Sequence, residues 1–335
     1  MIHHYAASWT SSREKMTMFL IRHRQSIWLR VPLGILKILR NSKAILRFKV
    51  KRIYYKYYKS KKRLLLIEKQ LKKLAKNTYI AIHHPKWLGV SISTKELFKH
   101  TLKLEELRDP SEALPIAKML CAKKPTSIFF SGIAEGWIDV IQEIKKLDRQ
   151  ISIKVIWHGS NALLTEDYDF KVFMEVLEAQ KNKYVDQIAF VKKSMYEFYL
   201  QKGFNVSFLM NTVKLEQKNI LKPQTKTVKI GLYSSGNRWV KNTYNQLAAA
   251  SLLPNHEIDC LPMSTNIEKY SKLLKINTKG NKHHLSRDAL LKKLSLNDLN
   301  MYVTFTECAP LLPLESFELR RSLHYGKQSS LLGKH

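Results

Sequence analysis

The sequence predicts an α/β protein with two successive doubly wound domains and a basic helical extension in front of them. Its 335 residues, 44% of them hydrophobic, are enough for two cores of ordinary domain size. From residue 77 onward, short apolar runs that suit buried strands alternate with helical patterns, which is typical of parallel sheets covered by helices. The alternation stops at the polar stretch LEQKNILKPQTKT and then restarts. We therefore expect one domain over residues 77–212 and a second over residues 213–335.

The extension carries more than half of the excess positive charge. The formal net charge is +31, and residues 22–76 hold 19 Lys or Arg against one acid, Glu68. Over residues 26–76, apolar and aromatic residues alternate with the basic ones at helical spacing, which predicts an amphipathic helix on an anionic membrane surface. A solvated helix packed on its own domain is the alternative. Nucleic acid is a less favoured partner, because the sequence lacks zinc-finger spacing, an RNP-like motif and a Gly-rich RNA clamp.

Cysteine usage and hydropathy predict a cytoplasmic protein that is peripheral at the inner face of the membrane. The three cysteines are far apart and form no C-x-x-C pair, so neither a disulfide framework nor a zinc site is indicated. The first residues lack the basic and apolar regions of a secretory signal. The stretch SIWLRVPLGILKIL is too short to span a bilayer, and Arg30 and Lys37 interrupt it.

The first domain is expected to start with the strand TYIAIHH. It runs into PKWLGVSISTKELFKH, which we interpret as a loop containing Gly, Ser and Thr before a helix. The unit repeats as SIFFSG followed by GWIDVIQEIKKL, and IKVIWHGSN, DFKVFMEVLEAQKNK, QIAFVKKSMYEFYLQKG and VSFLMN continue it. The pattern predicts a parallel sheet with helices on both faces.

The second domain ends in a motif that suits a ligand site. After VKIGLYSS, NTYNQLAAASLL, IDCLPM, IEKYSKLL and RDALLKKLS, the last strand is predicted as NMYVTFTE, ending at Glu307. CAPLLP then forms a loop, and Pro313 suits the first turn of the helix LESFEL, which places Glu315 beside that helix start. Ligands of open parallel sheets bind beyond the carboxyl ends of the strands. We expect Glu307 to meet sugar hydroxyls and Glu315 to accept bonds from a ribose.

A family resemblance supports this interpretation. The E-x7-E spacing from Glu307 to Glu315, on the last strand, loop and helix of a second Rossmann-like domain, resembles retaining GT-B glycosyltransferases of family 4. The stretch VKKSMYEFYLQKGFNVSFLMNTV is similar to the end of their first domain, and GLYSSGNRWVKN is similar to the loop that opens their second. The likeness covers roughly residues 77–319. It implies a GT-B fold and a hexosyltransferase that uses a nucleotide-sugar donor and a lipid-linked or saccharide acceptor in polysaccharide synthesis.

The resemblance also implies roles for four further residues. Arg238 and Lys241 would hold the donor diphosphate, His158 in VIWHGSN would face the donor sugar as a catalytic residue beside Glu307, and Gly89 would approach the donor closely. A departing nucleoside diphosphate builds up negative charge, which fixed cations can stabilise without a metal. No metal ion and no further cofactor are therefore expected.

Both ends of the chain depart from the family pattern. HHYAASWTSSREKMTMFLIRH resembles the tail of family 32 glycosyltransferases, so residues 1–25 are interpreted as a possible remnant of such a protein, with no functional residue carried over. After LESFEL the family continues with Gly-Val-Pro, whereas RRSLHY stands here at residues 320–325. A local frameshift is our hypothesis, because codons exist whose offset reading restores Gly-Val-Pro. With the end at His335, the second domain is expected to be incomplete and the enzyme to have little or no activity.

Two alternatives to a glycosyltransferase stay open. Two carboxylates can also serve as the acid and base of a glycoside hydrolase, but the phosphate-binding cations would then have no role. A non-catalytic remnant that binds membranes or polyanions would follow from the basic extension alone.

Overall fold

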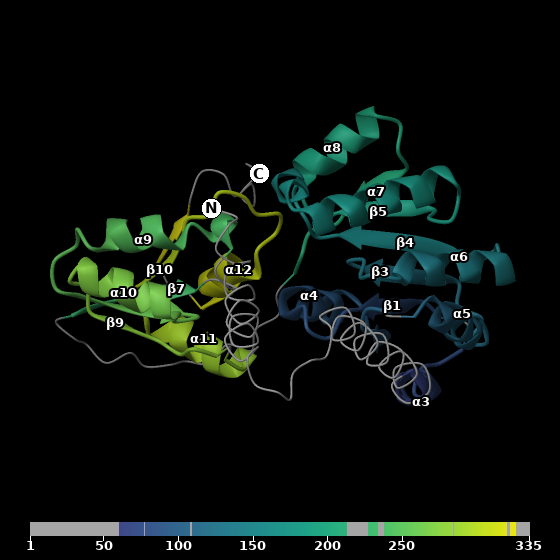
Figure 1. The fold of residues 1–335 in the computed structure, drawn as a ribbon, viewed down its shortest axis with the longest axis horizontal. Helices are drawn as coiled ribbons and strands as arrows, with labels where there is room; N and C mark the ends of the chain where they lie inside the picture. The colour runs from purple at the N-terminus through teal and green to yellow at the C-terminus, as the bar shows by residue number, and fades with distance from the viewer. Residues whose placement is uncertain are drawn as a thin grey trace, which may run out of the picture. The chain divides into compact units, whose positions relative to one another are not determined.

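The computed structural model describes residues 60–76, 78–107, 109–212, 227–233, 238–283 and 285–319, together with the backbone of 322–325 (Figure 1). The predicted remnant at 1–25, most of the predicted basic helix and most of the polar stretch LEQKNILKPQTKT lie outside these residues. The described residues from Lys62 onward belong to one compact unit, which contains two separate parallel sheets.

The first sheet has six parallel strands in the order β2-β1-β3-β4-β5-β6. Its core residues come from strands that are apolar on both faces, as expected for a sheet with helices on both sides. The strands are β1 (Ile80–His83), β2 (Thr101–Lys103), β3 (Ser127–Ser131), β4 (Ser152–Trp157), β5 (Gln187–Phe190) and β6 (Val206–Phe208), and the helices between them are α4 (Leu88–Leu97), α5 (Ala113–Cys121), α6 (Trp137–Leu147), α7 (Asp167–Lys181) and α8 (Lys193–Gln201).

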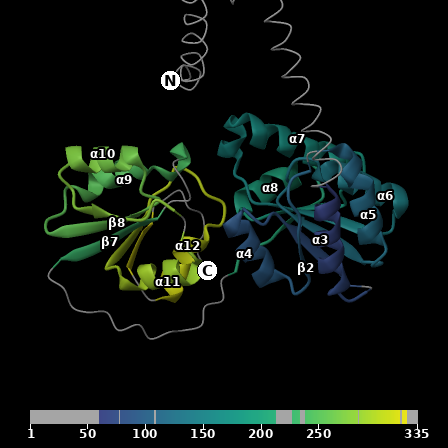
Figure 2. The ribbon, with the colours of Figure 1, turned by 60° about the horizontal axis from the view of Figure 1, so that its bottom comes forward.

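The second sheet has five parallel strands in the order β11-β10-β7-β8-β9. One apolar cluster joins the sheet to α9 and α10, a second joins it to α11 and α12, and Figure 2 shows these helix pairs on opposite faces. The elements are β7 (Val228–Tyr233), α9 (Thr243–Ala250), β8 (His256–Leu261), α10 (Thr265–Leu273), β9 (Thr278–Lys279), α11 (Arg287–Leu296), β10 (Leu299–Tyr302), α12 (Leu311–Glu318) and β11 (Ser322–Tyr325). The two sheets confirm the predicted α/β fold with two doubly wound domains.

The helix α3 (Ser60–Lys72) is the part of the basic extension that the structure describes. Ile67 and Leu71 are buried in the core of the first domain, and the Arg63 guanidinium donates a 2.7 Å hydrogen bond to the carboxylate of Glu112. Along these residues the helix therefore packs on its own domain, as the alternative interpretation predicted. None of the helices in the described part of the chain is long and apolar enough to cross a membrane.

Three local predictions need correction or refinement. The helix α4 begins at Leu88, so Gly89 lies in a helical turn and not in a loop. The strand β10 ends at Tyr302, so Glu307 belongs to the loop after the strand and does not end the strand itself. In the stretch RRSLHY, which departs from the family pattern, Ser322–Tyr325 form β11, which pairs in parallel with β10. The frameshift hypothesis stays a prediction.

Candidate active site

The order of the second sheet reverses between β7 and β10, and a mostly buried cluster of charged side chains lies beyond the carboxyl ends of these two strands. Lys241 forms an ion pair with Oε1 of Glu307, and the hydroxyl of Tyr302 donates a 2.8 Å hydrogen bond to the same oxygen. The side chains of Lys241 and Glu307 are 13% and 16% exposed. This Lys–Tyr–Glu cluster (Lys241, Tyr302, Glu307) places a cation and an anion side by side at the edge where open sheets bind ligands.

Gln246 of α9 holds the two backbone segments that carry the cluster. Its side-chain amide donates a 2.9 Å hydrogen bond to the carbonyl of Lys241, and its Oε1 accepts one of 2.9 Å from the N–H of Val303. A backbone bond from the N–H of Phe305 to the carbonyl of Val240 adds a second link. Because Gln246 is almost fully buried, these bonds are shielded from water and fix the two segments relative to each other.

Arg238 lies at a small pocket where α9 begins. The pocket, of about 200 Å³, is lined by Arg238, Trp239, Asn242, Thr243, Tyr244, Asn245 and Phe305. The first turn of a helix presents free N–H groups and a positive dipole end, so a guanidinium beside it reinforces an environment for anions. The Arg238 guanidinium lies 3.4 Å from a carboxylate oxygen of Asp169 and 3.9 Å from one of Glu166. Since the Arg238 side chain remains 44% exposed, these contacts leave it accessible to a ligand.

Glu315 lies deeper than the sequence predicted. Because α12 starts at Leu311, Glu315 follows the first turn and is only 4% exposed. Its Oε1 lies 3.0 Å from a guanidinium nitrogen of Arg287 on α11. Burial raises the pKa of the Glu315 carboxyl, and the charge of Arg287 opposes that shift. This carboxylate therefore joins α11 and α12 through an ion pair.

His158 follows the carboxyl end of β4 in the first domain. Its Nε2 lies 2.9 Å from the hydroxyl of Ser131, which ends β3, and that hydroxyl lies 2.7 Å from the hydroxyl of Thr94 on α4. Burial lowers the pKa of His158 to about 4, so the ring is neutral at pH 7. The side chain can then serve as a hydrogen-bonding group but not as a fixed cation.

Gly89 is exposed in the first turn of α4, and a Cβ added there would meet no atom within 4 Å. The close approach of Gly89 to a ligand stays a prediction.

A polar pair, His84 and Glu106, lies near the carboxyl end of β1. Nε2 of His84 lies 2.6 Å from Oε2 of Glu106, and the ring centroids of Trp87 and His84 are 4.7 Å apart. Burial raises the pKa of Glu106, but its bond with His84 and further contacts outweigh this and lower the pKa to about 2.

The loop after β10 contacts the carboxyl edge of the first sheet within the same compact unit. The hydroxyls of Thr306 and Ser160 are 2.9 Å apart, and the side-chain amide of Asn211 donates a 2.8 Å bond to the carbonyl of Ala309. Thr306 directly precedes Glu307, and Ser160 lies two positions after His158. These bonds place the backbone segments that carry His158 and Glu307 close to each other.

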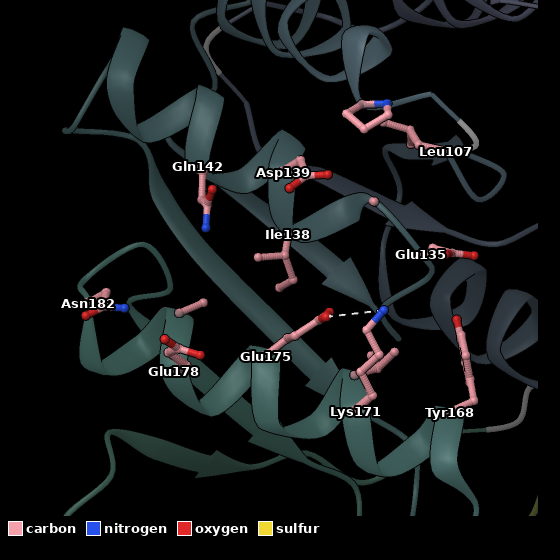
Figure 3. A pocket seen from close by; sticks show the side chains of 14 residues that line it. Leu107, Glu135, Ile138, Asp139, Gln142, Tyr168, Lys171, Glu175, Glu178 and Asn182 are labelled. Atoms are coloured by element: carbon pink, nitrogen blue, oxygen red, sulfur yellow. Dashed lines mark ion pairs between the residues drawn. The ribbon is translucent and has the colours of Figure 1, made fainter.

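A larger pocket, of about 430 Å³, lies between α6 and α7 in the first domain (Figure 3). Glu135, Asp139, Glu175 and Glu178 line it, and Lys171 faces Glu175 at 3.8 Å. Such an acidic surface repels phosphate, so this pocket does not suit the donor that the sequence predicts. Among the described residues, no group of His, Cys, Asp and Glu has the arrangement of a metal site.

The sequence matches no protein-family model and no curated protein sequence. In contrast, solved structures share its fold. HepE from Anabaena in complex with UDP-glucose aligns with a TM-score of 0.53 and 10% identity over 77% of this chain and 83% of that protein. A UDP-forming α,α-trehalose-phosphate synthase from Burkholderia xenovorans aligns with a TM-score of 0.51 and 8% identity over 76% of this chain and 85% of that protein. The fold is GT-B. At such identities the likeness establishes the fold, and the site must be argued from its own residues.

Three residues of this GT-B chain that contribute to the site geometry were not predicted. Tyr302 lies in a predicted strand, and a phenol at the carboxyl end of a strand near Glu307 is a usable signal of a polar contact. Gln246 stands among Leu and Ala in NTYNQLAAASLL, and a lone amide in an apolar helical run indicates a buried hydrogen bond. Ser131 ends SIFFS and gave no signal of its own, because its contact with His158 joins two different strands.

Proposed function

We propose that this chain is a glycosyltransferase that moves a sugar from a nucleotide-sugar donor to a lipid-linked or saccharide acceptor in polysaccharide synthesis. The observation that carries the proposal is the Lys–Tyr–Glu cluster at the strand-order reversal of the second sheet, next to the Arg238 pocket. HepE, whose fold is similar, binds UDP-glucose. The resemblance noted in the sequence adds a retaining, family 4-like hexosyltransferase as the finer assignment.

The chemistry follows from where the charges lie. A diphosphate seated at the start of α9 would meet Arg238 and the positive dipole end of the helix. Lys241 would leave Glu307 for the phosphate, since a dianionic group competes well for an ammonium ion. Glu307, released from Lys241 but still held by Tyr302, could then accept bonds from sugar hydroxyls. The two cations would stabilise the charge that develops as the nucleoside diphosphate departs, and no metal ion is expected.

Glu315 has a more demanding role in this scheme. Arg287 contacts one of its carboxylate oxygens, so a ribose hydroxyl would have to bind the other. The ion pair would then act as a support that fixes the carboxylate before the nucleotide arrives, which lowers the entropic cost of binding.

The hydrolase alternative fits the geometry less well. A glycoside hydrolase needs one protonated carboxyl and one carboxylate across the same bond. Here Glu307 is paired with Lys241, and Glu315 is buried against Arg287. Arg238 and Lys241 would also have no substrate group to bind.

A panel of UDP-, GDP- and TDP-sugars, measured for binding and nucleotide release, tests the proposal against hydrolysis of simple glycosides. Arg238→Ala and Lys241→Met should each weaken affinity for the bound nucleotide at least tenfold, because each removes a charge-assisted bond worth about 1.5–3 kcal/mol. Lys292→Met, which removes an exposed cation from α11, is the matched control and should change little. A folded protein that binds no nucleotide, or whose variants all bind equally, would contradict the proposal and favour the non-catalytic, polyanion-binding alternative.

We also propose that the protein is cytoplasmic and binds the inner face of the membrane through its basic extension. The described end of that extension supports this. Leu65 and Leu66 on α3 are 57% and 53% exposed and lie among lysines, whereas Ile67 and Leu71 hold the helix on the domain. Apolar side chains beside cations suit an anionic lipid surface.

A further inference from the structure

The hydroxyls of Ser131 and Thr94 connect His158 to the backbone of α4. Three contacts form the chain: Nε2 of His158 to the Ser131 hydroxyl at 2.9 Å, the Ser131 hydroxyl to the Thr94 hydroxyl at 2.7 Å, and the Thr94 hydroxyl to the Val90 carbonyl at 2.6 Å. Ser131 and Thr94 are fully buried, so water cannot replace a missing partner in this chain.

The direction of each bond follows from the last contact. The Thr94 hydroxyl has one hydrogen and two oxygen neighbours, and since the Val90 carbonyl is the nearer and can only accept, we place that hydrogen on the bond to Val90. The Thr94 oxygen then accepts, and the hydrogen between the two hydroxyls belongs to Ser131. With its own hydrogen directed at Thr94, the Ser131 oxygen can only accept from His158. Nε2 of His158 must therefore carry a hydrogen.

The protonation state of the other ring nitrogen of His158, Nδ1, follows from the first. The ring is neutral at pH 7, because burial lowers its pKa to about 4, and a neutral imidazole carries one hydrogen. With that hydrogen on Nε2, Nδ1 has a lone pair. Among the described residues, Ser131 is the one hydrogen-bond partner of the His158 side chain, so Nδ1 has no protein donor there.

We infer that Ser131 and Thr94 are positioning residues of the donor site, which hold His158 as its Nε2–H tautomer so that Nδ1 accepts a hydrogen bond from a donor sugar hydroxyl. This inference rests on the proposed function. It adds a role for the fold itself. Through Thr94 and Ser131, the carbonyl of Val90 on α4 determines which ring nitrogen of His158 carries the hydrogen. An acceptor at Nδ1 favours a hydroxyl and rejects an analogue in which that hydroxyl is absent.

The tautomer can be measured without any substrate. In histidine labelled with ¹⁵N, long-range proton–nitrogen spectra distinguish protonated from unprotonated ring nitrogens, and loss of a signal in His158→Asn assigns it. The wild type should show Nε2 protonated and Nδ1 unprotonated at pH 7. Thr94→Val removes the acceptor of the Ser131 hydrogen, so Ser131 should turn to donate to Nε2 and the tautomer should switch. Thr94→Ser keeps the hydroxyl and should preserve the wild-type spectrum. Thr165→Val removes a hydroxyl bonded to a different helical carbonyl and is the matched control.

Binding then tests the role. Thr94→Val should weaken affinity for UDP-glucose about three- to tenfold, as expected for one lost hydrogen bond, and leave affinity for UDP unchanged. Thr94→Ser should restore the wild-type ratio of the two affinities. An unprotonated Nε2 in the wild type overturns the inference whatever the protein binds, and so does an equal loss of affinity for UDP and UDP-glucose. If the wild type shows the expected tautomer but binds neither UDP nor UDP-glucose, the donor assignment fails while the hydroxyl chain stands.

Discussion

The buried ion pair between Glu315 and Arg287 allows the contribution of Glu315 to stability to be measured separately from its contribution to nucleotide binding. Their side chains are 5% and 24% exposed, and the closest N–O distance is 3.0 Å. Removing one partner of a buried pair costs about 3–5 kcal/mol, because the other charge is left without compensation. Since both terminal nitrogens of the Arg287 guanidinium are buried, we expect Glu315→Leu to lower the free energy of unfolding of the second domain by about 3–5 kcal/mol.

The double variant Glu315→Leu/Arg287→Met should recover most of that loss, because replacing a buried ion pair by apolar residues is often neutral. Urea denaturation gives the free energies, and hydrogen exchange in peptides of α11 and α12 shows that the change is local. Additive losses in the double variant would refute the claim that the two residues act as a pair. Glu257→Leu, which breaks the more exposed pair with Lys279, is the control and should cost about 1 kcal/mol or less.

Nucleotide affinity of the same variants decides whether Glu315 binds ribose. If it does, the double variant is stable but binds UDP about tenfold more weakly, since a charge-assisted bond is missing. If stability and affinity recover together, Glu315 has a structural role alone.

The pH dependence of the free energy of unfolding gives a further check on Glu315. Burial raises the folded-state pKa of Glu315, so the folded protein binds more protons than the unfolded chain between the two pKa values. The contribution of this group to stability is present below its ordinary pKa and is lost as pH rises, and Glu315→Leu should abolish that slope.

Two further outcomes are expected. Both ring nitrogens of the buried His83 lack a partner in the described part of the chain, so His83→Leu should raise the free energy of unfolding by about 1–2 kcal/mol in urea titrations at pH 7. Burial, with nearby lysines, lowers the pKa of His83 to about 4, so wild-type stability should fall as pH drops from 6.5 to 4, and the variant should show a smaller fall. For the membrane proposal, Leu65→Ser/Leu66→Ser in the full chain should reduce sedimentation with anionic vesicles at low salt, whereas Leu252→Ser, an exposed change in the second domain, should not. If both variants sediment equally with the vesicles, α3 does not contact the membrane.

The sequence predicted the sheets because their strands are short apolar runs with few alternatives, such as IAIH and SIKVIW, between helices of ordinary length. It misplaced the start of α4 because Trp87 gives no side-chain cap that would mark it. Glu307 was assigned to a strand because VTFT has strong strand propensity, yet the chain there leaves β10 to bond with Gln246 and Val240.

The ion pairs of the site lay beyond sequence reasoning. Lys241 and Glu307 are 66 positions apart, and no local pattern indicates that these two predicted ligand-binding residues contact each other. Arg287 stands in an ordinary helix start, RDALL, and nothing in that stretch indicates a buried partner. Such contacts follow from how helices cross a shared sheet, which sequence periodicity does not specify.

The side-chain amide of Gln246 limits what natural variation can do at that position. One end donates to the carbonyl of Lys241 and the other accepts from the N–H of Val303, so both a donor and an acceptor are needed at a fixed separation. Glutamate has the same shape but cannot donate when ionised, and methionine and leucine can do neither. Asparagine has the chemistry but is one methylene shorter. Core positions of α9 such as Leu247 and Ala250 are constrained by size, whereas a single-base change from glutamine to glutamate at position 246 would remove the bond to the carbonyl of Lys241 without altering the size of any side chain.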